Sequence, residues 1–376
     1  NKLKIKYQIN RCNYFVSIKK QLDNTFVKDI ERINSDKNIL IVYDKNIKNS
    51  FIKEFHSLLK ISGCKIFLLK LEGSKKNKNE KTLFNILNYL LAKNFSKKSV
   101  LISIGGGVLG DVCGLAASLY LRGMIYFNVP STMTAMVDSC LGGKTAINYK
   151  NIINSIGTYH HADHVFIFNE LIQSLPEKEF LAGIPEILKC GLIKKNKIIK
   201  TLEAEKNKIL KRDFYTLRNL IKDTLMTKVS FFKNDIYEKQ LRLSLNFGHT
   251  FAHAIEMATA QMIKNDYLRH GEAVGIGILC EMFYDNNKNK SINVVENILT
   301  SYGLPIRVIN RKKYDSEFIQ KLQYYIYKFI FFDKKKINKN PRYISLKNLY
   351  RPKIKEMTNQ DMIDHTIYKY MIWLIK

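Results

Sequence analysis

Ser99-Val-Leu-Ile-Ser-Ile104 runs directly into Gly105-Gly-Gly-Val-Leu-Gly-Asp111, and this junction decides the fold. The apolar, β-branched run before the glycines predicts a buried strand, and the residues after them predict a helix. Gly105, Gly107 and Gly110 satisfy the pattern G-x-G-x-x-G, in which backbone N–H groups approach a pyrophosphate at a helix N-terminus. A plain tight turn also fits these glycines, but the strand before them and the helix after them favour a dinucleotide site.

The acidic residue that usually contacts the ribose of a dinucleotide is missing from its usual position in this sequence. No acidic residue follows the glycines at a distance of about 20 residues, where the usual dinucleotide fingerprint has one. Asp44, at the end of an earlier predicted strand, could reach a ribose instead, or it could cap the following turn.

Outward from the glycines, short β-rich runs alternate with helical ones. We expect strands at 38–43, 65–70, 124–129 and 165–168, and helices at 49–62 and 82–93. Such alternation predicts an α/β domain over residues 1–176, with a mostly parallel, doubly wound, Rossmann-like sheet.

After residue 176 the pattern changes to helices alone. Helical periodicity covers 177–199, 201–233, 250–260, 271–286 and 316–331. We therefore expect an all-α domain over residues 177–376.

The chain has 376 residues, enough for two domains, and a formal net charge of +29. This excess of cations would suit a nucleic-acid binder, but Lys and Asn are scattered through nearly every polar stretch instead of forming a tract. We therefore expect a solvated lysine surface and no nucleic-acid partner. The same charge pattern does not argue against an anionic small-molecule ligand, which a few of these cations could bind.

Cysteine spacing and hydropathy indicate a cytoplasmic protein. The six cysteines form no C-x-x-C pair, which argues against a disulfide framework or a thiolate zinc site and fits a reducing compartment. No secretory signal is recognised at the start of the sequence. The most apolar window, 100–121, contains consecutive glycines and Asp111, so we expect no membrane span.

The second half contains a cluster of potential metal ligands. His249 and His253 are four residues apart on one face of a predicted helix, and His270 lies just before the next helix. Upstream, Glu186 and Lys189 share one helical face. Two imidazoles and a carboxylate would leave coordination positions open on a catalytic divalent ion. Any one of these histidines could be an ordinary surface or core residue, so the spacing alone leaves the ligand set open.

Leu141-Gly-Gly-Lys144-Thr145 looks like the end of a P-loop, but Asp138 stands where the first P-loop glycine would be. A nucleotide triphosphatase is therefore not expected. The two glycines and Lys144 still offer a flexible backbone and a cation for a phosphate or a carboxylate.

Taken together, several motifs resemble those of the 3-dehydroquinate synthase family in order and approximate spacing. They are Gly105–Asp111, Arg122-Gly123, Pro130-Ser-Thr132, Val137-Asp-Ser139, Gly142-Gly-Lys-Thr145, Asn246-Phe-Gly-His-Thr250 and His270-Gly-Glu272. The resemblance extends over residues 44–335. It implies an N-terminal α/β NAD-binding domain, a helical C-terminal domain, an active site between them and a homodimer.

The resemblance also implies the cofactor and metal residues. Glu186, His249 and His270 would bind Zn2+ or Co2+. NAD would contact Asp44, Gly105, Gly106, Gly107, Asp111, Ser131, Thr132, Asp138 and Ser174.

The implied substrate is an anionic sugar phosphate, 3-deoxy-D-arabino-heptulosonate 7-phosphate. Its carboxylate would contact Lys228 and Arg242. Its phosphate would contact Lys144, Asn154 and Asn246 with Lys334 or Lys335, and a neighbouring subunit would contribute Arg122. The implied catalytic residues are Lys189, Glu238, Asn246 and His253. His253 would transfer protons near neutral pH, or would only orient His249 or a water molecule.

The implied reaction releases phosphate and forms 3-dehydroquinate. NAD withdraws a hydride from a ring alcohol, phosphate is eliminated, the hydride returns, and the opened ring closes by an aldol step. The chain departs from the family pattern at four places. Ile153 replaces a lysine, 76–81 alters a Gly-Glu stretch before a nucleotide-contacting lysine, Ser131 replaces a threonine and Ala182 replaces an asparagine.

Three alternatives stay open at this point. Another sugar-phosphate cyclase or a metal-dependent polyol dehydrogenase of the same superfamily would share these motifs, although Lys228 and Arg242 together favour a carboxylated substrate. A basic nucleic-acid-binding protein without catalysis would bind DNA or RNA in a salt-sensitive manner. The fold could also persist without activity because Ile153 replaces the lysine of the family.

Overall fold

The computed structural model describes residues 2–9, 12–32, 36–150, 152–264, 267–285, 289–332, 341–347 and 349–357. The chain forms two compact units. The first consists of Asn1–Phe180 with Arg212–Leu225, and the second of Leu181–Lys211 with Met226–Lys376.

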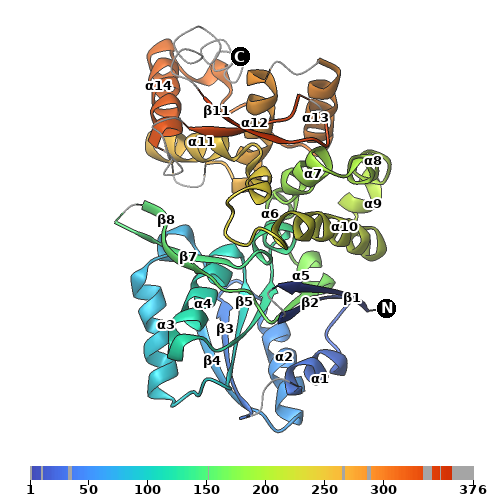
Figure 1. Ribbon diagram of the computed structural model, residues 1–376, viewed down its shortest axis with the longest axis vertical. Helices are drawn as coiled ribbons and strands as arrows, with labels where there is room; N and C mark the ends of the chain where they lie inside the picture. Colours follow the sequence, from blue (N-terminus) through green and yellow to red (C-terminus); the bar gives the residue numbers. More distant parts are fainter. Residues whose placement is uncertain are drawn as a thin grey trace. The chain divides into compact units, whose positions relative to one another are not determined.

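A seven-stranded sheet is the centre of the first unit (Figure 1). In spatial order its strands are β1 (Leu3–Ile9), β2 (Cys12–Lys19), β9 (His164–Phe168), β6 (Ile125–Pro130), β5 (Val100–Gly105), β3 (Asn38–Asp44) and β4 (Lys65–Leu71). All pairings are parallel except that of β1 with β2. The predicted, mostly parallel sheet is confirmed, with one antiparallel strand added at its edge.

Helices cover both faces of this sheet. They are α1 (Asn24–Glu31), α2 (Asn49–Ile61), α3 (Glu80–Ala92), α4 (Gly107–Leu119) and the short α5 (Asn169–Gln173). Figure 1 shows α1 and α2 on one side of the sheet and α3 and α4 on the other. Side-chain caps define two of the helix starts, since Asp23 accepts from the Thr25 amide and Asn79 from the Thr82 amide. The doubly wound prediction is therefore confirmed.

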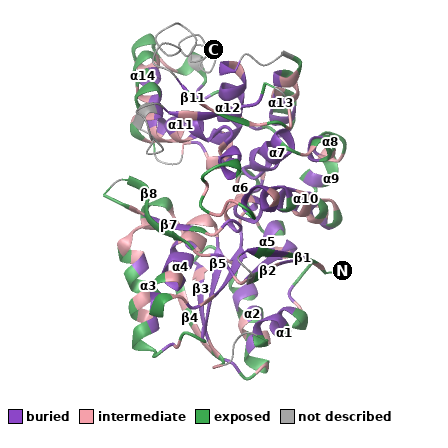
Figure 2. Cartoon of the chain, viewed as in Figure 1, coloured by how far each residue is buried: buried purple, intermediate pink, exposed green. Residues whose placement is uncertain are grey.

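Strand β5 shows why this sheet was predictable. Each of its residues is buried, and Val100, Leu101 and Ile102 are fully enclosed. Figure 2 shows the same continuous burial along the central strands. Parallel strands packed by helices on both faces are apolar throughout, and that composition is what the sequence displays.

A second, two-stranded sheet was not predicted. It pairs β7 (Lys144–Tyr149) with β8 (Ile152–Tyr159) in antiparallel fashion, and α4 packs on β7. Every residue of β8 is exposed, so the strand lacks the inside–outside alternation by which a half-buried strand is recognised.

The second unit is largely helical. Its helices are α7 (Ile184–Ile193), α8 (Asn196–Ala204), α9 (Lys206–Leu210), α11 (His249–Met262), α12 (His270–Tyr284), α13 (Asn289–Ser301) and α14 (Ser316–Phe332). Short turns of helix in the first unit are η1 (Lys75–Asn77), η2 (Tyr120–Arg122) and η3 (Ala135–Ser139). Those in the second unit are η4 (Leu241–Asn246) and η5 (Arg311–Lys313). Helices α6 (Glu177–Leu181) and α10 (Phe214–Phe232) each contribute residues to both units.

The expectation of an all-α second half is wrong in one respect. Strands β10 (Arg342–Ser345) and β11 (Lys353–Glu356) form a small antiparallel sheet. Carboxylates on α12 hold β10 in place, since Glu281 accepts from the Ile344 amide at 3.3 Å and Asp285 accepts from the Ser345 hydroxyl at 2.7 Å. Strand β10 therefore depends on contacts with α12, and a local sequence pattern cannot indicate such tertiary contacts.

The predicted continuous helices over 177–199 and 201–233 are wrong, because the chain breaks each of them. Gly183 precedes α7, and Pro185 lies in its first turn, where the missing N–H has no intrahelical partner to lose. Lys194 and Lys195 separate α7 from α8 with non-helical dihedral angles. Before α10, Arg212 takes a left-handed conformation, with φ of 56°.

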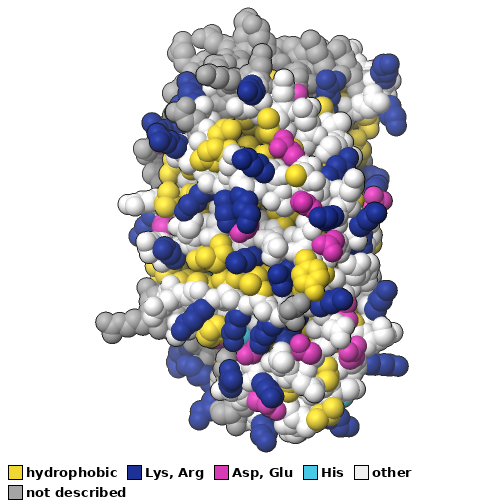
Figure 3. Space-filling model, turned by 90° about the vertical axis from the view of Figure 1, so that its right-hand side faces the viewer, with side chains coloured by type: hydrophobic (Ala, Val, Ile, Leu, Met, Phe, Trp, Pro, Cys, Tyr) yellow, Lys and Arg dark blue, Asp and Glu magenta, His cyan; other side chains and the backbone are white. Residues whose placement is uncertain are grey.

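Basic side chains are dispersed on the face shown in Figure 3, where Lys and Arg alternate with hydrophobic and acidic side chains. Within the described part of the chain, no helix combines the length and the apolar character that crossing a bilayer requires.

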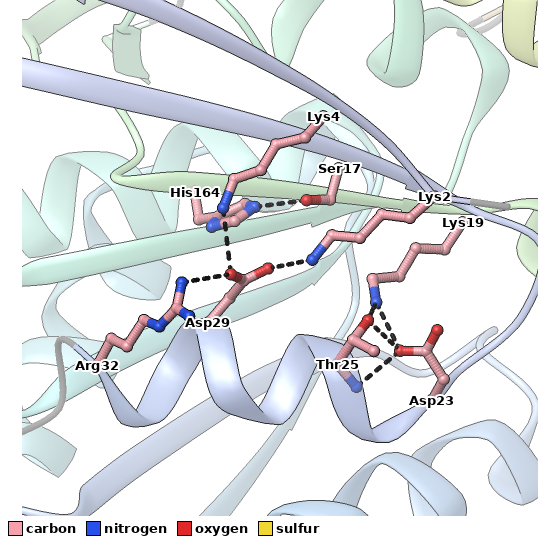
Figure 4. A network of polar contacts seen from close by, with 9 residues as sticks. All are labelled: Lys2, Lys4, Ser17, Lys19, Asp23, Thr25, Asp29, Arg32 and His164. Atoms are coloured by element: carbon pink, nitrogen blue, oxygen red, sulfur yellow. Dashed lines mark hydrogen bonds and ion pairs between the residues drawn. The ribbon is translucent and has the colours of Figure 1, made fainter.

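A partly buried polar network joins α1 to the edge of the large sheet (Figure 4). Asp29 is paired with Lys2 at 2.8 Å and with Lys4 at 3.1 Å. Beside it, the Ser17 hydroxyl lies 2.8 Å from Nε2 of His164. Burial lowers the pKa of His164 to about 3, although the nearby Asp29 carboxylate acts in the opposite direction. The folded state therefore keeps this imidazole neutral.

We expect His164 to make folding stability sensitive to acid. An unfolded histidine titrates near pH 6.5 and this folded one near pH 3, so the unfolded state binds more protons between these values. The contribution of His164 is complete above pH 6.5 and is lost on acidification, by up to about 1.4 kcal/mol per pH unit. Urea unfolding at several pH values should show a flatter acid slope in His164→Gln than in the wild type. His56→Gln on α2 is the control, and an unchanged slope in His164→Gln would contradict the assignment.

Candidate active site

Glu186, His249 and His270 lie together in the second unit. One ligand atom from each residue is within 4.8 Å of the others. The Nε2 atoms of His249 and His270 are 3.4 Å and 3.5 Å from Oε1 of Glu186. Each residue belongs to the first turn of its helix, namely α7, α11 or α12. A carboxylate and two imidazoles facing one point are a suitable ligand set for a divalent ion.

Two glycines of α12 permit this helix to approach the other two ligand-bearing segments closely. A Cβ atom at Gly271, next to His270, would lie 1.6 Å from the carbonyl oxygen of Ala182. A Cβ at Gly277 would lie 2.1 Å from the carbonyl oxygen of Gly248, which precedes His249 and has a φ of 82°. Helix α12 is therefore in direct backbone contact with the segments that carry the other two ligands.

The Glu186 carboxylate is buried, at 1% exposure, yet it is ionised. Among the described residues, no donor meets hydrogen-bond geometry at either of its oxygens, although Nζ of Lys189 lies 2.5 Å from Oε2. Burial acts to raise the pKa of Glu186, but the charges of Lys189 and His249 outweigh it and hold this pKa well below its usual range. Available lone pairs on an ionised, buried carboxylate fit a metal ligand.

The two imidazoles use their other ring nitrogens differently. Nδ1 of His249 lies 3.2 Å from the carbonyl oxygen of Phe247, and burial lowers the pKa of this histidine. Nδ1 of His270 lies 2.9 Å from Oε2 of Glu256. Burial acts to lower the pKa of His270, but Glu256 and Glu186 raise it to about 10.

Glu256 was not predicted as a site residue. It follows His249 by seven residues and His253 by three, which places all three on one face of α11. This helical spacing was a usable signal in the sequence.

The predicted catalytic residues lie near the cluster or are paired with one another. The ring of His253 is 5.5 Å from that of His249 and 6.1 Å from that of His270. The Asn246 amide donates to Glu238 at 2.8 Å, and Glu238 has a left-handed φ of 56°.

The predicted carboxylate-binding cations Lys228 and Arg242 are both buried. The guanidinium of Arg242 donates to the Ile236 carbonyl at 2.5 Å and lies over the Phe232 ring at 5.5 Å. The Asp235 carboxylate, which accepts from the Arg242 amide at 2.9 Å, also interacts electrostatically with Arg242. Lys334 and Lys335 lie outside the described residues.

In the first unit, several predicted cofactor residues gather where parallel strands end. Asp44 ends β3, Gly105 ends β5, and Ser131 directly follows β6. The Ser131 amide donates to the Gly105 carbonyl at 2.8 Å. Ligands of open α/β sheets bind at the carboxyl ends of adjacent strands. The ends of β3, β5 and β6 are such a location.

The glycine loop itself is tightly packed. A Cβ at Gly107 would lie 2.9 Å from the Ser139 hydroxyl, and one at Gly106 would lie 3.3 Å from Thr132. Asp138, in η3, immediately precedes Ser139. The loop, the residues after β6 and η3 thus form one surface around the start of α4.

Other predicted residues have contacts that a purely structural role also explains. The Asp44 carboxylate accepts from the amides of Asn46 at 2.8 Å and Gly73 at 2.9 Å, which is the turn-capping alternative. The Ser174 hydroxyl donates to the Leu171 carbonyl at 3.0 Å at the end of α5. Arg122, at the end of η2 (Tyr120–Arg122), and Lys144, at the start of β7, are exposed.

Lys78 is a second residue that the sequence analysis missed. Its ammonium lies 2.5 Å from Asp111 and 2.5 Å from the side-chain oxygen of Asn154, beside Ile153. Burial raises the pKa of Asp111 against the opposing charge of Lys78. The altered stretch 76–81 therefore supplies a cation next to the position where the family lysine is replaced. In so lysine-rich a chain, nothing in the sequence distinguished this lysine.

Comparisons with known proteins agree with the motif resemblance. The family model described as 3-dehydroquinate synthase N-terminal matches residues 68–182, and that described as 3-dehydroquinate synthase C-terminal matches residues 183–336. A 3-dehydroquinate synthase of Prochlorococcus marinus subsp. pastoris is 36% identical over 324 residues, which is 84% of this chain and 88% of that protein.

Solved structures of two sugar-phosphate cyclases have the same fold. A 2-deoxy-scyllo-inosose synthase complexed with carbaglucose-6-phosphate, NAD+ and Co2+ has a TM-score of 0.81 and 21% identity, covering 97% of this chain and 100% of that one. The 2-epi-5-epi-valiolone synthase of Streptomyces hygroscopicus subsp. jinggangensis 5008, with NAD+ and Zn2+ bound, has a TM-score of 0.81 and 20% identity, covering 98% of each chain.

We expect Gly271→Ala to disrupt the ligand cluster. The added methyl group would lie 1.6 Å from the Ala182 carbonyl, so α12 must move away from α7. We expect the free energy of unfolding to fall by more than about 2 kcal/mol in urea titrations. Gly275→Ala is the matched control on the same helix, because its new contacts begin at 3.1 Å and involve side-chain atoms. Equal stabilities of the two variants would contradict this account of the helix approach.

Proposed function

This chain belongs to the 3-dehydroquinate synthase family, and from that membership we infer that it is an NAD- and metal-dependent lyase that converts 3-deoxy-D-arabino-heptulosonate 7-phosphate to 3-dehydroquinate and phosphate. The observation that carries the proposal is the convergence of Glu186, His249 and His270 on one point. Three protein ligands leave coordination positions open for a substrate oxygen.

Glu186, His249 and His270 are the proposed ligands of Zn2+ or Co2+. When bound, the metal ion would polarise a substrate hydroxyl, and NAD would accept a hydride from its carbon and later return it. Lys189 keeps Glu186 ionised and is itself close enough to donate to a substrate oxygen beside the ion. His253, whose ring is 5.5 Å from that of His249, is the proposed proton-transfer residue.

Buried cations are the proposed binding groups for the substrate carboxylate. Lys228 and Arg242 are buried cations of the second unit, and a carboxylate would accept charge-assisted hydrogen bonds from them. The Glu238 carboxylate orients the amide of Asn246 through the bond at 2.8 Å. Asn246 is proposed to contact the phosphate together with Lys144, Asn154, Arg122 of a second copy and Lys334 or Lys335.

The first unit is proposed to bind NAD at the carboxyl ends of β3, β5 and β6. The pyrophosphate would lie against Gly105, Gly106 and Gly107, where α4 begins, because amides at a helix N-terminus favour an anion. The further proposed contacts are Asp44, Asp111, Ser131, Thr132, Asp138 and Ser174.

Assays of phosphate release test this proposal. We expect one phosphate per substrate, dependence on NAD, no accumulation of NADH, and loss of activity on chelation. Glu186→Gln should reduce kcat by at least about 100-fold, since polarisation by a metal ion is worth several kcal/mol. Glu296→Gln on α13 makes the same charge change elsewhere in the unit and should leave kcat unchanged.

Two outcomes would contradict this proposal. Full activity of Glu186→Gln, or of the chelated enzyme, would refute the metal assignment. Stoichiometric NADH without phosphate release would identify a polyol dehydrogenase instead.

We further propose a homodimer formed through β8. Within the described residues β8 pairs with β7 alone, which makes it the edge of a two-stranded sheet. Its side chains Ile152, Ile156 and Tyr159 are exposed, as is Leu121 in η2, which precedes Arg122. An exposed apolar edge strand is a ready template for pairing with another chain, and a second copy presents the same edge.

Sedimentation of the purified protein tests the homodimer. We expect twice the mass of the chain, and Ile156→Lys should weaken the association by about tenfold or more by burying a charge in the contact. Ile61→Lys, at an isoleucine on α2 that is 83% exposed, is the control. A monomeric wild type, or an Ile156→Lys variant as dimeric as the control, would refute this interface.

A further inference from the structure

The second ring nitrogens of the two proposed imidazole ligands have acceptors of different charge. His249 is paired through Nδ1 with a neutral backbone carbonyl, that of Phe247, at 3.2 Å. His270 is paired through Nδ1 with the carboxylate of Glu256 at 2.9 Å. In both residues Nε2 is the atom that faces Glu186.

We propose that Glu256 is a positioning residue that fixes His270 as an Nε2 ligand and sets the affinity of the site for its divalent ion. This inference rests on the metal site put forward under the proposed function. An Nδ1–H that donates to a carboxylate leaves Nε2 unprotonated, and it makes the imidazole a stronger donor to the metal.

The first turn of α12 shows why the ring of His270 needs such a partner. Glu272 accepts from the Arg269 amide at 2.7 Å, and Gly271 abuts Ala182. Both contacts hold the backbone, and neither limits rotation of the His270 ring. The side chain of His270 is 33% exposed, against 10% for His249, so packing encloses it less. The ring is therefore oriented by its side-chain contacts, of which the one with Glu256 at 2.9 Å is shorter than the one with Glu186 at 3.5 Å.

Glu256 is well placed to act on a residue of another helix. It is 15% exposed, lies on α11 and shares the helix face of His249. Helix α11 thus supplies one ligand directly and orients a second ligand that α12 carries. The charge of Glu256 also adds to that of Glu186 beside a divalent cation.

Zinc titration of the metal-free, full-length protein in competition with a chromophoric chelator tests the proposal. We expect Glu256→Gln to bind Zn2+ about 10- to 100-fold more weakly than the wild type, because glutamine keeps an acceptor but removes the charge. Glu256→Leu, which removes the acceptor, should bind at least as weakly as Glu256→Gln. Glu296→Gln is the matched charge control and should bind as the wild type does.

A spectroscopic readout separates positioning from general destabilisation. In the zinc-loaded wild type labelled with 15N, the Nδ1 proton of His270 should resonate downfield of that of His249, because its acceptor is charged. This difference should disappear in Glu256→Gln while the His249 resonance stays in place.

The outcomes distinguish this inference from the proposed function. Wild-type protein that binds no equivalent of Zn2+ would refute the metal site and this inference together. Wild-type binding with a Glu256→Gln affinity within twofold of it would overturn the role of Glu256 alone. Weaker Zn2+ binding in Glu256→Leu but not in Glu256→Gln would also overturn the role of Glu256, since the proposal assigns the change in affinity to its charge.

Discussion

The close approach of α12 to two other segments is the constraint on which the second unit depends. Glu186, His249 and His270 meet because α12 abuts Ala182, just before α7, at Gly271, and abuts Gly248, just before α11, at Gly277. The positive ends of these helices stabilise the Glu186 carboxylate and disfavour protonated imidazoles. At His270 burial also acts to lower the pKa, but the Glu256 and Glu186 carboxylates outweigh it and raise the pKa. A divalent cation in this position would replace the proton that they attract.

In the first unit, the proposed binding of a large anion depends on backbone atoms. Its sheet places the ends of β3, β5 and β6 side by side, and the glycine loop packs against Thr132 and Ser139 with no side chain of its own. Lys78 then joins Asp111 on α4 to Asn154 on β8. A single ammonium thereby ties a proposed cofactor contact to a proposed substrate contact.

Local patterns were informative wherever burial is continuous or motifs are contiguous. The parallel strands were predictable because β3 and β5 are apolar throughout, and the helix start at α4 because the glycines follow β5 directly. Spacing alone left the ligand set open, since Glu186 is 63 residues before His249 and only tertiary packing brings them together. Strands β8 and β10 were missed because one is exposed throughout and the other is fixed by carboxylates of α12. Lys78 was missed because it is one cation among 62.

The ion pair between Lys189 and Glu186 bears on whether the second unit needs a bound metal ion in order to fold. A buried carboxylate without compensation would oppose folding, whereas here an ammonium 2.5 Å away already balances it. The newly synthesised polypeptide can therefore complete its second unit before any transition metal is available. If the proposed divalent ion is scarce, we expect intact molecules without the ion to accumulate, and later supply of the ion would load them without new protein synthesis.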